Sequence, residues 1–338
     1  MNATSAPLRE GIHMAVQLGF ALRFVAFAAL AGAAQLVVAQ QDFPGRKPIE
    51  FIVLFPAGSS ADVTARVLAE GMGRQLGTQI VVVNRPGGGG AVGYKYAAAQ
   101  APDGHHLVWN SNSISTTYHT GTLPFDYRAF APVARVQIET PLLFVRAEAP
   151  WKSLHDVVQY AKANPGKLTV GNSGSGSHTH FSSVWLFTAA GSPVVDVPFN
   201  AAQVVPSLLG GHVDAVVQLP GALAGHVKSG TVRALAAMSG ARDPALPDVP
   251  TAREQGVNAV AELWRGIAAP KGTPARIVAR LEDAIRVTVT GPEFVKAAEK
   301  LLVAPAYLPA AEFGRLIARE DAEIAQAVKA LGLRQDSK

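Results

Sequence analysis

One short segment, residues 51–62 with the sequence FIVLFPAGSSAD, constrains the fold of this chain more than any other. A hydrophobic run over residues 49–55 is typical of a buried strand, and a helical stripe of apolar residues begins at Val63. Pro, Gly and Ser stand between the two, so the segment predicts a strand, a loop and the start of a helix. The first turn of a helix has N–H groups without intrahelical partners and a partial positive charge, which suits a carboxylate or a phosphate.

The same residues are also explained without a ligand. Ser59 or Ser60 then serves as the N-cap, and Asp62 is a first-turn acid that interacts favourably with the helix dipole. Caps of this kind are common, so the segment alone leaves both a binding loop and an ordinary helix start open.

The beginning of the chain is typical of an export signal. Arg9 and Arg23 precede a long apolar stretch over residues 24–38. Val37-Val38-Ala39, just before Gln40, place small residues at the positions that a signal peptidase reads. We therefore predict a cleaved signal peptide over residues 1–39 and a periplasmic location.

Two alternatives concern this segment. A single membrane anchor would use residues 24–41, but that run includes three glutamines and lacks a basic flank, so export is the better interpretation. Either Met1 or Met14 can be the start, and the later one gives a signal of more ordinary length.

Composition indicates a globular protein with a large core. The chain has 338 residues, of which 49% are hydrophobic and 16% charged, and this length favours about two domains. The net charge is +5, but the charges are scattered, so no basic stripe suits a nucleic-acid backbone. There is no cysteine, and a core of this size can stabilise an exported protein without disulfides.

The strand, loop and helix start predicted around residues 49–63 have a counterpart in the second half of the chain. Residues 168–171 are typical of a strand, residues 172–177 form a loop of small residues, and residues 178–190 have the pattern of a helix. Around both units strands alternate with helices, which predicts an α/β fold of mostly parallel sheets flanked by helices. We expect the polar stretch 110–117 to be a loop at a strand end, suited to a small polar ligand or simply solvated, and residues 127–133 to be a turn-rich connector.

Three apparent motifs do not indicate a nucleotide-binding, catalytic or metal site. Gly88, Gly90 and Gly93 fit G-x-G-x-x-G, but the helix after them is short and no acid follows about 20 residues on, so we expect a tight turn with close backbone packing. A nucleophile elbow needs a Gly two positions before and two positions after its Ser, but Ser173 and Ser177 hold these positions around Ser175. His178 and His180 have no third metal ligand near them in the sequence, and we interpret them as residues at a helix start, so we predict no catalytic residue, metal or cofactor.

At these loops the chain resembles the Bug family, which are exported solute-binding receptors of tripartite tricarboxylate transporters. The resemblance extends over about residues 48–321, nearly all of the mature protein. Each matching stretch is short, and their order and spacing make the match specific. They lie at residues 47–49, 55–62, 84–87, 101–104, 163–168, 174–177 with His180, 208–211 and 245–251.

The resemblance implies a two-domain, type II periplasmic binding fold with the ligand in the interdomain cleft. Domain one would comprise residues 41–142 plus 262–338, and domain two residues 143–261. The implied ligand-binding residues are Phe55, Pro56, Ala57, Gly58, Ser59, Ser60, Ala61, Asp62, Asn110, Ser111, Ser113, Ser173, Ser175, Ser177, His180, Phe199, Asn200 and Gln218.

Two departures from the family pattern bear on the ligand. Ala57-Gly58-Ser59-Ser60 stands where the family usually has Pro-Gly-Gly after the first Pro, and Phe199-Asn200-Ala201 stands where it usually has Tyr-Lys-Gly. Because a Lys that would pair a second carboxylate is missing, we expect a monocarboxylate or a polar neutral tail rather than citrate.

The leading hypothesis is a monomeric receptor that binds a small organic acid or amino acid and delivers it to membrane transporter subunits. A sensing receptor that docks a signalling protein is one alternative. A secreted hydrolase using Ser175 or His180 is the other.

Overall fold

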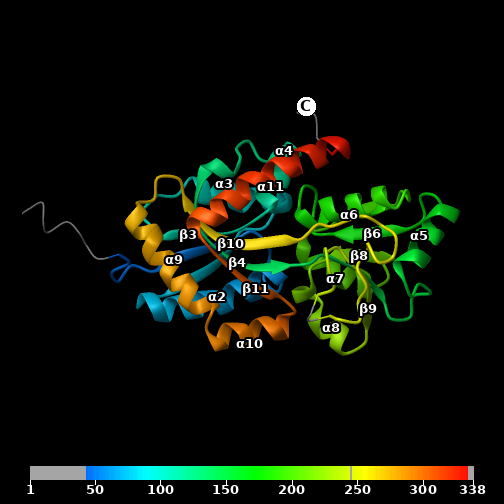
Figure 1. Ribbon diagram of the computed structural model, residues 1–338, viewed down its shortest axis with the longest axis horizontal. Coiled ribbons are helices and arrows are strands. Elements are labelled where there is room, and N and C mark those ends of the chain that lie inside the picture. The colour runs from blue at the N-terminus through cyan, green and yellow to red at the C-terminus, as the bar shows by residue number, and fades with distance from the viewer. Residues whose placement is uncertain (1–42, 244–245, 334–338) are drawn as a thin grey trace, which may run out of the picture. The chain divides into compact units, whose positions relative to one another are not determined.

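The computed structural model describes residues 43–243 and 246–333 (Figure 1). The predicted signal peptide, residues 1–39, lies outside the described residues. Within the described part, no helix combines the length and the apolar character needed to cross a lipid bilayer. From Arg46 onward the chain forms one compact unit built on two sheets.

The first sheet has six strands in the order β11-β4-β10-β3-β1-β2. Strand β1 pairs in parallel with β2 and β3, whereas β10 and β11 pair antiparallel with their neighbours. The bounds are Ile49–Val53 for β1, Ile80–Asn84 for β2, His106–Ser111 for β3, Phe130–Glu139 for β4, Leu263–Pro270 for β10 and Ala304–Pro309 for β11.

The second sheet has five strands in the order β7-β6-β8-β5-β9. Strand β6 pairs in parallel with β7 and β8, and β5 pairs antiparallel with β8 and β9. Both sheets are therefore mixed, and the pairing is less parallel than the alternation of elements predicts. The bounds are Leu142–Arg146 for β5, Thr169–Asn172 for β6, Val195–Pro198 for β7, Ala215–Gln218 for β8 and Val232–Ala237 for β9.

Helices cover both faces of each sheet. In Figure 1, α3, α4 and α11 lie on one face of the six-stranded sheet, and α2, α9 and α10 lie on the other. The bounds are Ser60–Leu76 for α2, Ala91–Ala98 for α3, Ser113–His119 for α4, Leu154–Ala163 for α5, His178–Ala189 for α6, Ala201–Leu209 for α7, Ala224–Lys228 for α8, Ala275–Val289 for α9, Pro292–Leu301 for α10 and Ala310–Ala330 for α11. Three short 3-10 turns, η1 Gly88–Gly90, η2 Tyr127–Ala129 and η3 Pro220–Ala222, complete the described elements.

The chain changes sheets twice. It leaves the first sheet after Glu139 and starts β5 at Leu142, and it leaves the second sheet after Ala237 and starts β10 at Leu263. The strand that follows each crossing pairs antiparallel with a strand of the parallel group in its new sheet. In the first sheet β10 pairs with β3 in this way, and in the second sheet β5 pairs with β8. The domain bounds given above, 41–142 plus 262–338 and 143–261, stay a prediction.

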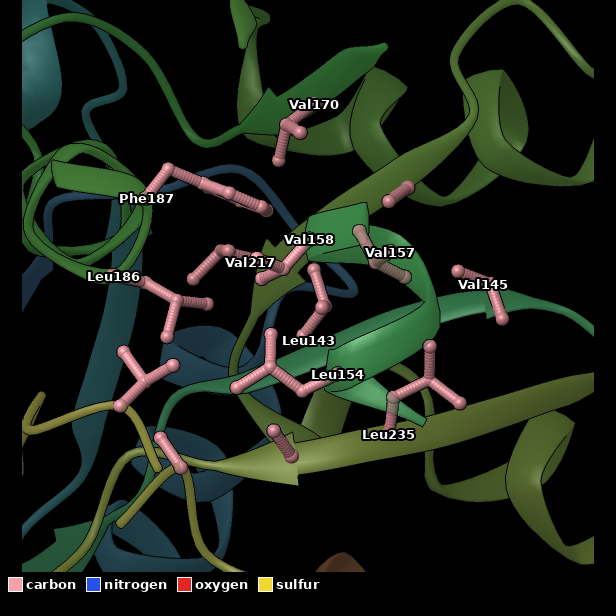
Figure 2. Close-up of a cluster of buried hydrophobic side chains, with 14 of the residues drawn as sticks. Leu143, Val145, Leu154, Val157, Val158, Val170, Leu186, Phe187, Val217 and Leu235 are labelled. Carbon is pink, nitrogen blue, oxygen red and sulfur yellow. The ribbon is translucent and has the colours of Figure 1, made fainter. Parts of the chain in front are cut away.

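The core of the second sheet explains why its strands are so apolar. Successive residues of a strand point to opposite faces, so Leu143 and Val145 pack against α5 and α6 (Figure 2). Leu142 and Phe144 pack on the opposite face, against α7. Ser153 caps α5 in a capping box, in which Asp156 is the reciprocal partner.

Two local expectations were wrong. Residues 113–117 of the expected polar loop belong to α4, whose hydroxyl groups bond back to carbonyls of the preceding turn, as Thr117 does to Ser113. The expected connector at residues 127–133 holds η2 and the start of the ten-residue strand β4, which is paired on both sides by β10 and β11.

Candidate functional site

Two helix N-termini, one beside each sheet, line a single cavity of about 280 Å³. Ser60 and Ala61 belong to the first turn of α2, and His178 and Thr179 belong to the first turn of α6. The other lining residues are Phe55, Ala57, Gly58, Ser59, Ser113, Ser173, Ser177, Ala201, Ala202, Val205, Gln218, Leu219, Ala222, Leu263 and Arg265.

Ser59 is the N-cap of α2, which decides between the two serines considered from the sequence. Its backbone is extended (φ −69°, ψ 159°), its hydroxyl oxygen accepts from the Asp62 N–H at 3.3 Å, and its carbonyl accepts from Val63 at 3.0 Å. Within the described residues the N–H groups of Ser60 and Ala61 have no acceptor. They are the free donors that the first turn of any helix leaves.

Helix α6 repeats this arrangement. The hydroxyl oxygen of Ser177, the N-cap, accepts from the His180 N–H at 3.2 Å, and its carbonyl accepts from Phe181 at 3.0 Å. The N–H groups of His178 and Thr179 have no acceptor in the part of the chain that the structure describes. Two pairs of free donors, each with the positive end of a helix dipole behind it, therefore adjoin one cavity.

Asp62 shapes the loop before α2 and does not line the cavity. Its Oδ2 accepts from the Gly58 N–H at 3.0 Å and its Oδ1 from Asn84 Nδ2 at 3.0 Å, while the same Asn84 group donates to the Phe55 carbonyl at 2.8 Å. Arg66 forms a salt bridge to it at 2.8 Å. Burial acts to raise the pKa of Asp62, but the hydrogen bonds from Arg66, Gly58 and Asn84 hold that pKa below its usual value.

A buried ion pair adjoins the cavity through Arg265, which is one of its lining residues. Arg265 on β10 is 2% exposed, Glu139 at the end of β4 is 1% exposed, and Arg265 Nε donates to Glu139 Oε2. The Ser60 hydroxyl donates to the other carboxylate oxygen of Glu139. Arg265 Nη1 is buried and has no hydrogen-bond partner among the described residues. Neither Glu139 nor Arg265 is among the residues predicted from the sequence, although an Arg within the apolar run 263–270 is unusual enough to indicate a buried partner.

His178 is a buried, neutral part of the wall. Its Nε2 lies 2.8 Å from the Ala261 carbonyl and therefore carries the proton in this hydrogen bond. Burial is the main reason that the pKa of His178 falls to about 4. Among residues 43–243 and 246–333, no three His, Cys, Asp or Glu side chains are grouped as a metal ion would require.

A second cavity, of about 420 Å³, shares Phe55, Ser173 and Ala201 with the first. The glycine turn of residues 87–90 forms one wall of it. A Cβ on Gly89 would lie 2.6 Å from the Ser177 backbone nitrogen, so the predicted close backbone packing at this turn is confirmed.

The structure brings most of the sequence-predicted residues to these two cavities. The first is lined by Phe55, Ala57, Gly58, Ser59, Ser60, Ala61, Ser113, Ser173, Ser177 and Gln218, and the second also by Pro56, Ser175, Phe199 and Asn200. Four predicted residues, Asp62, Asn110, Ser111 and His180, line neither cavity.

The last three of these make internal contacts instead. Asn110 Oδ1 accepts from the Tyr94 hydroxyl at 2.8 Å, and Ser111 Oγ accepts from the Ser113 N–H at 3.3 Å. His180 Nε2 lies 3.4 Å from Asp196 Oδ2. Burial lowers the pKa of this histidine and raises that of the aspartate.

Comparisons with known proteins agree on one family. The model of the family described as "Tripartite tricarboxylate transporter family receptor" matches residues 64–333. A UPF0065 protein in the gbd 5′ region of Cupriavidus necator is 31% identical over 328 residues, which are 95% of this chain and 98% of that protein.

Two solved structures show the same similarity. The periplasmic binding protein BugD is 28% identical with a TM-score of 0.82, over 87% of this chain and 100% of that one. MatC from Rhodopseudomonas palustris with bound malate is also 28% identical with a TM-score of 0.79, over 85% of this chain and 100% of that one.

Proposed function

Because this chain belongs to the tripartite tricarboxylate transporter family of receptors, we propose that it captures a small carboxylate-bearing solute and delivers it to a membrane transporter of that tripartite type. As a member of this family it is a periplasmic solute-binding receptor and not an enzyme. The family and the fold class predicted from the sequence are confirmed.

One observation carries the proposal that the solute bears a carboxylate. The free N–H groups of Ser60 and Ala61 and those of His178 and Thr179 adjoin the same cavity from helices beside different sheets. Backbone donors at helix N-termini hold anionic oxygens without needing a basic side chain. That MatC has malate bound supports the same class of ligand here.

A cavity lined from both sheets also suits capture by closure. Residues 142–261 lie between the two sheet crossings, and lining residues come from this segment and from the rest of the chain. We propose that the ligand joins the two predicted domains through the paired helix N-termini.

A thermal-shift screen of mono-, di- and tricarboxylates and amino acids tests the proposal on the mature protein. A ligand at 100 times its Kd stabilises the folded state by about 2.7 kcal/mol. With about 2.1 cal/mol/K of unfolding entropy per residue over about 290 residues, the melting temperature should rise by about 4 °C. If no member of a broad carboxylate panel shifts the melting temperature, the proposed ligand class is wrong.

Delivery needs a separate test. Membranes from the producing bacterium should retain the liganded receptor together with transporter subunits, and co-purification with a signalling protein alone would instead favour the sensing alternative.

A further inference from the structure

Among the described residues that line the first cavity, Arg265 alone carries a permanent charge. The register places it on the strand next to Glu139, since Arg265 lies opposite Gln137 and Leu263 lies opposite Glu139 on the antiparallel pair β10 and β4. Both side chains are almost fully buried. The guanidinium and the carboxylate therefore form a compensated pair, and the cavity gains no net charge from them.

The pair is also attached to the helix start that adjoins the cavity. The hydroxyl of Ser60, the first residue of α2, donates to one carboxylate oxygen of Glu139, and Arg265 Nε donates to the other. Arg265 keeps Nη1 without a partner among the described residues, although a guanidinium has five N–H donors. A buried, unpaired donor on a residue that lines the cavity is a point where a ligand oxygen would be favoured.

The net charge of the site follows from these contacts. Each helix N-terminus is equivalent to about half a positive charge, so α2 and α6 together supply about one. His178 adds none near neutral pH, because its pKa is about 4. One ligand carboxylate then neutralises the site, whereas a second would leave a buried and uncompensated negative charge, which is costly.

We propose, resting on the proposed function above, that the Glu139–Arg265 pair limits the ligand of this receptor to one carboxylate with an uncharged remainder. Glu139 is the determinant of this selectivity, because it cancels the guanidinium that would otherwise balance a second ligand carboxylate.

The rest of the lining fits an uncharged remainder. Phe55, Ala202, Val205, Leu219 and Ala222 present apolar surface to the cavity. The Gln218 amide is already used, since its Nε2 donates to Ser173 Oγ at 2.9 Å and its Oε1 accepts from the Leu219 N–H at 2.8 Å.

A cycle of charge variants tests this proposal: wild type, Glu139→Gln, Arg265→Gln and the double variant. Each monocarboxylate that stabilises the wild type in the screen is paired with its counterpart that carries a second terminal carboxylate, as hexanoate is paired with adipate. Calorimetric titration gives the ratio of the two Kd values for every variant. Melting temperatures without ligand report folding separately.

The wild type should prefer the monocarboxylate by about tenfold or more, and Glu139→Gln should move the ratio toward the dicarboxylate by about tenfold or more. Arg265→Gln should weaken both ligands, and the double variant, in which the pair is again neutral, should return the ratio to within about threefold of the wild type. If Glu139→Gln does not fold, Arg265→Gln against the double variant makes the same comparison, because these two also differ by the Glu139 charge.

A different result is expected if the Glu139–Arg265 pair only holds β4 and β10 together and has no influence on which ligand binds. Loss of the contact between β4 and β10 would weaken both ligands alike, so an unchanged ratio across the cycle overturns the proposal, as does a wild type that prefers dicarboxylates. Failure of the wild type to bind any carboxylate would instead remove the proposed function on which this inference rests.

Discussion

Replacing Ser60 by proline should remove one ligand-facing N–H group and still allow α2 to form. Ser60 is the first helical residue, and Ser59 before it has ψ 159°, the extended conformation that the residue before a proline prefers. Proline is favoured at this position because its missing N–H has no helical acceptor. The substitution also removes the hydroxyl that donates to Glu139. Ser60→Ala loses the same hydroxyl but keeps the N–H, so it is the matched control.

The expected effect comes from a single hydrogen bond to a charged ligand. Such a bond contributes about 1.5–3 kcal/mol, and about 1.4 kcal/mol corresponds to a tenfold change in Kd. Ser60→Pro should therefore bind the carboxylate about 10- to 150-fold more weakly than Ser60→Ala does.

Calorimetric titration of both variants with a carboxylate from the screen measures this difference. Thermal unfolding without ligand checks that the two variants are similarly stable. Equal Kd values for the proline and alanine variants would refute the claim that the N–H at position 60 contacts the ligand.

Two further predictions concern the loops around the cavity. Because the folded-state pKa of Asp62 is lowered, its contribution to stability is present above the unfolded-state pKa of about 4 and is lost as pH falls through the folded-state value. Asp62→Asn should thus flatten the acid end of the melting-temperature profile, and it should weaken all ligands alike; a selective loss of amino acids would show instead that Asp62 binds an ammonium group. Gly89→Ala adds a Cβ where backbone already lies 2.6 Å away, so carboxylate affinity should fall by about tenfold or more. Gly230→Ala, which has a similar positive φ but open space around it, is the control, and equal affinities in the two variants would contradict the close approach.

Hydrophobic periodicity predicted the alternating elements well. The strand and helix expected at residues 168–171 and 178–190 are β6, Thr169–Asn172, and α6, His178–Ala189, and the cap of α5 follows from Ser153 and Asp156. These features depend on neighbours in the sequence, which patterns report directly.

The missed elements depend on tertiary contacts. Strand β11 contains Pro305 and Pro309, which argue against a strand in the sequence, but it lies at an edge of its sheet, where proline is tolerated. Helix α4 is rich in Ser and Thr, which favour turns, and its burial between other elements decides its conformation.

The loops of the site were predictable, and the charges behind them were not. Glu139 and Arg265 stand 126 positions apart, and only the pairing of β4 with β10 brings them together. The sequence prediction of a monocarboxylate rested on a missing Lys, whereas the structure offers Glu139 as a separate reason for the same expectation. The hydroxyl groups of Ser59 and Ser60 are both used internally, so an influence of Ser60 on specificity would act through Glu139.

A crystal structure with a bound carboxylate tests the central claim most directly. Carboxylate oxygens should lie about 3 Å from an N–H of the first turn of α2, at Ser60 or Ala61, and from one of the first turn of α6, at His178 or Thr179. A ligand that contacts neither helix N-terminus, for example one held only by the glycine turn of residues 87–90, would contradict it.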